Sequence, residues 1–289
     1  MIVQFKNVRK MKKFRSIPLL FVSLTFLVSS CVKKTQEVDN DTDSASENFL
    51  ATGIANDMNN IADEAGRTKS LSSFKSAEAN SILSSCATLK FDTLVSTNPD
   101  SMTVNFGPSN CNCNDGRTRR GSLLFVYTGK YRDSLTTITI TPINYFVNDN
   151  GVSGSKVVQN KGHNPAGHLV YEINENLIIT KAGGGTITHD AKRQREWFSG
   201  ENTIVWSDDT YYITGTASGL NSNGKEYRSN ITKPLLRNMA LGCRRHFTSG
   251  EFEHTPLGKA TRKVDFGDGT CDNLATVTID GKVYKIELP

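Results

Sequence analysis

Histidines and carboxylates are the side chains most able to do acid–base or metal chemistry, and two local groups bring them together. His163 and His168 lie five residues apart in a turn-rich segment, where they could bind a metal ion together with Glu172. Since no third ligand is indicated, a pair of exposed loop histidines is the simpler interpretation. His189 precedes Asp190 but lacks the Gly-x-Ser-x-Gly turn that presents a nucleophile. The sequence therefore predicts no catalytic residue, no metal site and no cofactor.

Basic and aromatic side chains gather in one segment and could bind a ligand. Residues 192–195, Lys-Arg-Gln-Arg, lead into Trp197, and Trp206 follows nine residues later. Arginine beside aromatic rings is a combination that binds sugars, phosphates or nucleic acids. The competing interpretation is a solvated strand face whose basic residues protect the sheet from aggregation. The predicted ligand-binding candidates are Arg193, Arg195, Trp197 and Trp206.

The sequence contains an internal echo in which two segments match without a gap. Val104-Asn-Phe-Gly-Pro-Ser-Asn-Cys111 corresponds to Val264-Asp-Phe-Gly-Asp-Gly-Thr-Cys271. Each copy has an upstream cysteine and is followed by a predicted strand and a Gly-Lys pair. We interpret the copies as related β modules at about residues 86–131 and 243–289, which flank a central meander.

This echo also predicts how the cysteines pair. The expected disulfides are Cys86–Cys111 and Cys243–Cys271, with separations of 25 and 28 residues. Closing loops of this length contributes roughly 3–4 kcal/mol each in the chain-entropy model. Cys113 is then left over, although Cys113 rather than Cys111 could pair with Cys86. Such disulfides belong to an oxidising compartment.

Residues 1–30 have the composition of an export signal. They carry six basic residues and no acid, and an apolar run of 12 residues occupies positions 17–28. A membrane-spanning helix needs ~20 apolar residues, so this run is too short and fits a signal-peptide core. Met11 opens a compact signal by itself, so the true start is either Met1 or Met11.

Val28-Ser-Ser-Cys31 resembles a lipobox, the site at which lipoprotein signal peptides are cut before a lipid-modified cysteine. The resemblance implies that Cys31 is lipidated and that its acyl chains hold the protein at a membrane. Ordinary secretion, with Cys31 as a structural thiol, is the alternative. Val32 stands where inner-membrane retention signals have aspartate, which favours an outer-membrane lipoprotein facing the periplasm or the cell surface.

The net charge bears on the class of partner. The chain has 34 basic and 29 acidic residues, a net charge of +5, which at first suggests an anionic partner. Without the six basic residues of the signal, 28 basic and 29 acidic residues remain, a net charge of −1. This balance argues against nucleic acid as the partner.

Two segments are expected to connect the anchor to a folded domain. Residues 31–45 are polar and acidic and predict a flexible tether, since they cannot bury apolar area. Residues 46–80 predict a helix over about 46–64 and a Ser/Lys-rich connector after it. The apolar stripe that should pack this helix on the domain consists of Phe49, Leu50, Ile54, Met58 and Ile61.

Residues 81–289 predict a β-rich domain. Runs of β-branched and aromatic residues alternate with Gly, Asn and Asp at a spacing near ten residues. No segment of helix length separates the predicted strands, which favours an antiparallel meander over parallel βαβ units. The fold class is therefore mainly β, an antiparallel meander in sandwich-like or elongated sheets, with one N-terminal amphipathic helix. A hydrophobic content of 37% suffices for a packed core.

Two cysteine motifs complete the pattern, Cys-Asn-Cys-Asn-Asp-Gly-Arg-Thr-Arg-Arg at residues 111–120 and Phe-Gly-Asp-Gly-Thr-Cys-Asp at residues 266–272. Together with the lipobox and the acidic tether, they resemble a family of uncharacterised lipoproteins of the Bacteroidota. The resemblance extends over roughly residues 45–289. It implies a location in the cell envelope, but it implies no activity and no catalytic residue.

We therefore expect a lipid-anchored cell-envelope protein that is not an enzyme and that binds or assembles with an envelope protein or a glycan. The alternative is an envelope hydrolase, directed at glycans or peptides, whose acids come together only in the fold. A clustered pair of carboxylates in a deep cleft would favour the hydrolase. A shallow aromatic groove or an exposed apolar patch would favour binding.

Overall fold

A computed structural model of the chain describes residues 39–67, 81–92, 100–129, 132–203 and 205–288. The predicted signal peptide, Cys31, most of the predicted tether and the Ser/Lys-rich connector lie outside the described residues. The described part from Asp39 onward forms one compact unit. No helix in it is long and apolar enough to cross a bilayer.

The protein is mainly β, as predicted, and its strands form a single 14-stranded antiparallel sheet. The strands are β1 (Thr88–Asp92), β2 (Asp100–Asn105), β3 (Cys111–Asn112), β4 (Thr118–Tyr127), β5 (Thr137–Val147), β6 (Asn150–His163), β7 (Leu169–Thr180), β8 (Thr186–Ser199), β9 (Thr210–Leu220), β10 (Glu226–Asn238), β11 (Ser249–Pro256), β12 (Arg262–Asp268), β13 (Leu274–Ile279) and β14 (Lys282–Glu287).

The order of the strands confirms the predicted meander. Apart from the short β3, which pairs with β4 alone, each strand lies beside its neighbours in sequence, from β1 at one edge to β14 at the other. Two-residue turns make such pairing local. Asn148 and Asp149 take positive φ angles of 47° and 62° between the paired residues Val147 and Asn150. Asparagine and aspartate tolerate this conformation, which matches the twist of a hairpin.

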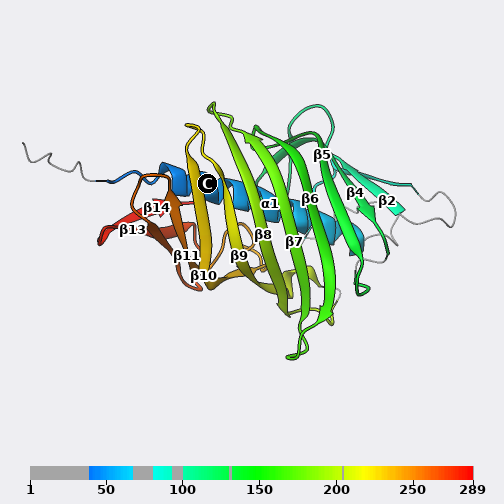
Figure 1. The fold of residues 1–289 in the computed structure, drawn as a ribbon. Helices are drawn as coiled ribbons and strands as arrows, with labels where there is room; N and C mark the ends of the chain where they lie inside the picture. Colours follow the sequence, from blue (N-terminus) through cyan, green and yellow to red (C-terminus); the bar gives the residue numbers. More distant parts are fainter. Residues whose placement is uncertain (1–38, 68–80, 93–99, 130–131, 204, 289) are drawn as a thin grey trace, which may run out of the picture. The chain divides into compact units, whose positions relative to one another are not determined.

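One helix, α1 (Asp43–Arg67), runs across the strands along one face of the sheet, which we call the inner face (Figure 1). The strands alternate accordingly, and β7 reads almost strictly as inward buried and outward exposed residues. The predicted apolar stripe packs as expected. Ile54, Met58 and Ile61 join the core of β2–β9, and Phe49 joins a second core with Phe252 and the residues of β10–β13.

The start of α1 and the segment that precedes it differ from the prediction. It begins at Asp43, three residues earlier than expected, because the carboxylate of Asp41 accepts a hydrogen bond from the Asp43 N–H at 3.0 Å and satisfies a donor of the first turn. Asp39 is tied to Arg262 on the sheet by a hydrogen bond of 2.7 Å. The final part of the predicted tether, from Asp39 onward, is therefore docked and not flexible.

Both predicted disulfides are present, Cys86–Cys111 and Cys243–Cys271. The structure thereby resolves the alternative in favour of Cys111 as the partner of Cys86. Cys113 keeps a free thiol in the interior, and burial raises the pKa of that thiol.

The two echo segments have the same local structure at opposite ends of the sheet. In the first, the Asn105 side chain accepts a hydrogen bond from the N–H of Gly107 at 2.9 Å; in the second, Asp265 accepts one from Gly267 at 2.8 Å. Both glycines take positive φ, at 83° and 89°, and the phenylalanine before each is buried. The repeated sequence therefore encodes one repeated turn that leads to a disulfide.

Candidate functional site

The two tryptophans predicted to bind a ligand are buried. Trp197 is 1% exposed, lies on the inner face of β8, and its indole N–H donates to Asp209 Oδ1 at 3.2 Å. Trp206 is 7% exposed and opens a short 3₁₀ helix, η2 (Trp206–Asp208). The prediction that these two rings form an exposed ligand-binding platform is therefore wrong. Alternation along β8 points Trp197 into the core.

The two arginines of the same prediction also point inward. Arg195 places its guanidinium 3.5 Å from the centroid of the Tyr211 ring, and Arg193 is buried nearby on β8. Alternation explains both positions, because residues 193, 195 and 197 share one face of the strand. Their neighbour Lys192 is on the opposite face, and this outer face is where the structure offers a site.

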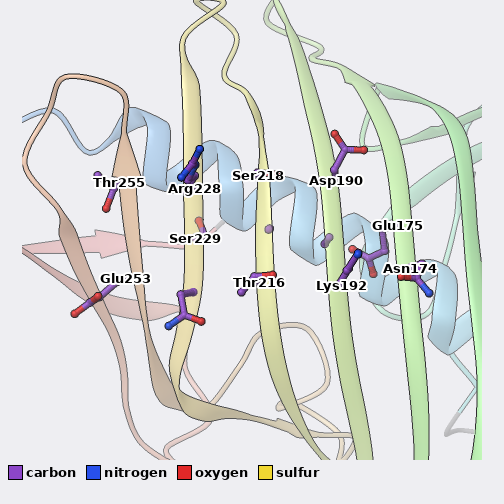
Figure 2. A pocket seen from close by; sticks show the side chains of 13 residues that line it. Asn174, Glu175, Asp190, Lys192, Thr216, Ser218, Arg228, Ser229, Glu253 and Thr255 are labelled. Atoms are coloured by element: carbon purple, nitrogen blue, oxygen red, sulfur yellow. The ribbon is translucent and has the colours of Figure 1, made fainter.

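A trough of about 730 Å³ crosses the outer face of the sheet over β7–β11 (Figure 2). Figure 2 shows its side chains on successive strands, with α1 behind the sheet. The lining is almost entirely polar and charged. It comprises Asn174, Glu175, Asp190, Ala191, Lys192, Thr216, Ala217, Ser218, Arg228, Ser229, Asn230, Glu253 and Thr255.

Strand register arranges one row of the trough. Lys192 is paired with Asn174 on one side and with Thr216 on the other, and Thr216 is paired in turn with Asn230. Asn230 faces Glu253 of β11. Directly paired residues have Cβ atoms about 4.5–5.5 Å apart. Five adjacent strands therefore present one continuous line of hydrogen-bonding groups.

A second row runs beside the first, two residues along each strand. Asp190 is paired with Ser218, which is paired with Arg228, and Arg228 faces Thr255. The charged residues of the second row are Asp190 on β8 and Arg228 on β10. Those of the first row are Lys192 on β8 and Glu253 on β11. The trough consequently has no net charge from these four ionisable groups.

The floor of the trough is low because β9 carries short side chains. Thr216 and Ser218 lie between the long side chains of Lys192 on β8 and Arg228 on β10. Below them β8 and β9 approach closely. A Cβ added at Gly215 would lie 2.1 Å from the carbonyl oxygen of Lys192, so only glycine fits there.

Three of the four outward charged groups of the trough are available to a ligand, whereas Asp190 already accepts a hydrogen bond from Asn176. Within the described part of the chain, Lys192, Arg228 and Glu253 make no ion pair and no side-chain hydrogen bond, and all three are exposed. Glu175 differs, because its carboxylate faces inward and accepts a hydrogen bond from Lys156 at 2.6 Å. The outer face thus offers donors and acceptors that folding has not used.

An aromatic pair extends this surface along β8 and β9. Phe198 is 47% exposed, and its ring centroid lies 5.0 Å from that of Tyr212 in an edge-to-face arrangement. A smaller hollow of about 130 Å³ lies beside Tyr212. Its lining residues are Gln194, Glu196, Tyr212, Thr214 and Pro234.

Sequence reasoning includes Tyr212 among possible sugar-binding aromatics but misses Phe198, although a signal existed. Trp197-Phe198 and Tyr211-Tyr212 are adjacent aromatic doublets on paired strands. Alternation requires one member of each doublet to face outward, and here Phe198 and Tyr212 do so.

The predicted loop histidines do not come together at a metal site. His163 Nε2 lies 2.8 Å from Glu201, and His168 Nδ1 lies 2.5 Å from Glu196, so each histidine has its own carboxylate partner. Among the described residues, no group of three His, Cys, Asp or Glu side chains is placed to hold a metal ion. Comparisons with protein-family models, with curated proteins and with solved structures gave no match.

Proposed function

We propose that this chain is a lipid-anchored cell-envelope protein that binds a polar ligand, of which a glycan is the best-fitting class, in the outer trough. The observation that carries the proposal is the trough itself, with two rows of polar groups across β7–β11, of which Lys192, Arg228 and Glu253 have no side-chain partner among the described residues. A volume of about 730 Å³ is within the range of small-ligand sites, about 300–1,000 Å³. The anchor is Cys31, on the strength of the lipobox.

The chemistry of the lining favours hydroxyl-rich ligands over strongly charged ones. Hydroxyl groups both donate and accept hydrogen bonds, which matches a surface that mixes carboxylate, ammonium, amide and hydroxyl groups. The four ionisable groups balance, so neither a polyanion nor a polycation has an electrostatic advantage. Farther along the same two strands, Phe198 of β8 and Tyr212 of β9 offer an apolar surface for the C–H face of a sugar.

The alternative of a hydrolase gains no support from the trough. Its two outward acids, Asp190 and Glu253, are on β8 and β11 with two strands between them. Neighbouring strands lie about 4.8 Å apart, which separates these strands by roughly 14 Å. Glycosidase carboxylates are about 5–9.5 Å apart. The arrangement fits binding without catalysis.

A filling substitution tests the trough. Thr216→Trp places an indole on its floor and should weaken glycan binding at least tenfold, measured with the full chain in detergent on a glycan array and then by calorimetry with the best ligand. The matched control is Thr276→Trp, at an equivalent outward position on β13 outside the trough, which should bind as the unaltered protein does. Absence of glycan binding, or equal loss in both variants, would refute the proposal.

A further inference from the structure

A second hollow, of about 140 Å³, lies on the inner side of the sheet against α1. Its basic lining comes from three separate segments of the chain. Arg117 stands just before β4, Arg237 is near the end of β10, and Arg245 and His246 belong to the connection between β10 and β11. Three arginines and a histidine around one small hollow concentrate positive charge where little water can screen it.

Arg237 is the key residue of this hollow. Its side chain is 2% exposed, and its Nη1 donates to the carbonyl oxygen of Arg245 at 3.0 Å. Its Nε and Nη2 have no hydrogen-bond partner among the described residues, and neither has Nε of Arg245. Buried charged donors without partners are costly, and proteins normally satisfy them.

Nearby carboxylates do not supply the missing partners. Asp57 and Asp115 both bind Arg119, with Arg119 Nε 3.1 Å from Asp57 Oδ2 and Arg119 Nη1 2.9 Å from Asp115 Oδ1. Arg117 shares the same two acids at 3.3 Å and 3.2 Å. Two acids therefore serve two arginines, and Arg237 remains without a carboxylate partner within the described residues.

The acid–base properties of the hollow agree with this excess of positive charge. Burial, with the charge of Arg117 next, lowers the pKa of Arg237 to about 9. Burial and the charges of Arg237 and Arg245 lower the pKa of His246 to about 4, so this imidazole is neutral at pH 7. A bound anion would relieve both effects, because opposite charge favours the protonated forms.

The remaining wall of the hollow is apolar. It is formed by Phe49 and Ile54 of α1 together with Phe247 and Phe266, and the Phe49 and Phe266 rings meet edge to face at 5.5 Å. A purely inorganic anion would leave this wall without contacts. The hollow is about as large as an engineered cavity of roughly 150 Å³ that accepts benzene, which limits the occupant to a small molecule.

We propose that this hollow binds a small organic carboxylate, whose charged end pairs with Arg237 and Arg245 and whose short hydrocarbon part lies against Phe247 and Phe266. Guanidinium groups bind carboxylates through two parallel hydrogen bonds, which would satisfy the unpartnered Arg237 donors. Arg245 and His246 are only partly buried, so the hollow is open to solvent on their side. This site is separate from the outer trough, since α1 contributes to its lining.

Thermal unfolding of the full chain with benzoate and hexanoate tests the proposal, with benzyl alcohol and hexanol as neutral counterparts. Tm should rise with the two carboxylates, in proportion to the logarithm of their concentration once the site is saturated, and should not rise with the alcohols. A rise with inorganic phosphate or sulfate alone would contradict an organic ligand.

Substitution locates the site. Arg237→Met keeps the buried volume but removes the donors, and should weaken carboxylate binding at least tenfold. Arg245→Met, at a less buried position, should weaken carboxylate binding severalfold. This variant tests the location of the site if Arg237→Met does not fold. Lys285→Met, an exposed change on β14, should bind carboxylate normally. Carboxylate binding that survives both arginine substitutions would overturn the assignment, as would no binding by the unaltered protein.

Discussion

Glu64 shows how strongly the interior of this protein acts on a single residue. The side chain is 7% exposed near the end of α1, and burial raises the pKa of its carboxyl group to about 7. Hydrogen bonds from the Ser81 hydroxyl and, at 3.1 Å, from the Ile82 N–H only partly offset this effect. The carboxyl group is therefore half protonated near neutral pH.

This shift predicts a pH-dependent stability. In the folded protein the pKa of Glu64 is about 7, above the ordinary value of 4.5. The contribution of Glu64 to the stability of the fold is therefore fully present below pH 4.5 and is lost as the pH rises through 7. Glu64→Gln removes this loss. Relative to the unaltered protein, the free energy of unfolding of the variant should rise by about 3 kcal/mol between pH 4.5 and pH 8. Urea unfolding of both proteins at several pH values measures the difference.

Comparison of the two proteins cancels the titration of the buried histidines, which both contain. Glu287→Gln, on an exposed position of β14, is the matched control and should follow the unaltered protein at every pH. A Glu64→Gln difference that stays constant with pH would contradict the shifted pKa.

The sequence predicts which side chains of a strand share a face, but it does not predict which face is buried. Alternation correctly separates Tyr211, which is buried, from Tyr212 on the outer face. It does not tell which of the two faces α1 covers, because α1 ends 126 residues before Arg193 and 130 before Trp197. Without that information, the sequence could not show that Arg193, Arg195 and Trp197 of β8 face the core.

At the scale of elements, α1 is held by charged and polar contacts as well as by apolar ones. Asp57 binds Arg117 and Arg119, Glu47 accepts a hydrogen bond from Lys181 at 2.6 Å, and the Ala55 carbonyl accepts one from Lys156 at 2.7 Å. Tyr211 donates to Asp63 at 3.0 Å. The acidic helix and the basic inner face are therefore electrostatic counterparts.

Breaking one of these pairs should be costly. Asp57→Asn leaves the guanidinium of Arg119, which is fully buried, with a single carboxylate partner. Removal of one partner of a buried ion pair costs about 3–5 kcal/mol of stability, which we expect here in denaturant unfolding. Asp43→Asn, on an exposed residue of the same helix, should cost less than about 1 kcal/mol. Equal effects of the two substitutions would show that the ion pairs do not hold α1.

The existence of α1 was predictable from its apolar spacing, but its polar contacts were not. Asn, Asp and Glu between apolar positions are the usual sign of a solvated face. Here several of those residues are buried against distant partners, such as Arg119 for Asp57 at a separation of 62 residues and Tyr211 for Asp63 at 148. Local periodicity carries no information on such long-range pairing.

For the whole molecule, the echo predicted both disulfides, and strand spacing predicted the meander. The attachment to a membrane is still a prediction, since it depends on Cys31. Cys31→Ser should release the protein from the membrane fraction, because stable anchoring needs two or more acyl chains. Cys113→Ala, which removes the buried free thiol instead, should leave the protein in that fraction. Immunoblots of fractionated cells measure both. Retention of the Cys31→Ser protein would argue against lipidation.

The position of α1 also sets the order in which a growing chain can finish folding. Ser44 bonds to His254 and Asp39 to Arg262, over separations of 210 and 223 residues. At synthesis rates of about 5–20 residues per second, the helix waits roughly 10–40 s for these last contacts. During that time Asp39 and Ser44 have no partner on the sheet, whereas Asp57 can already pair with Arg119. A chain truncated before β11 therefore leaves the N-terminal end of α1 without the contacts that fix it to the sheet.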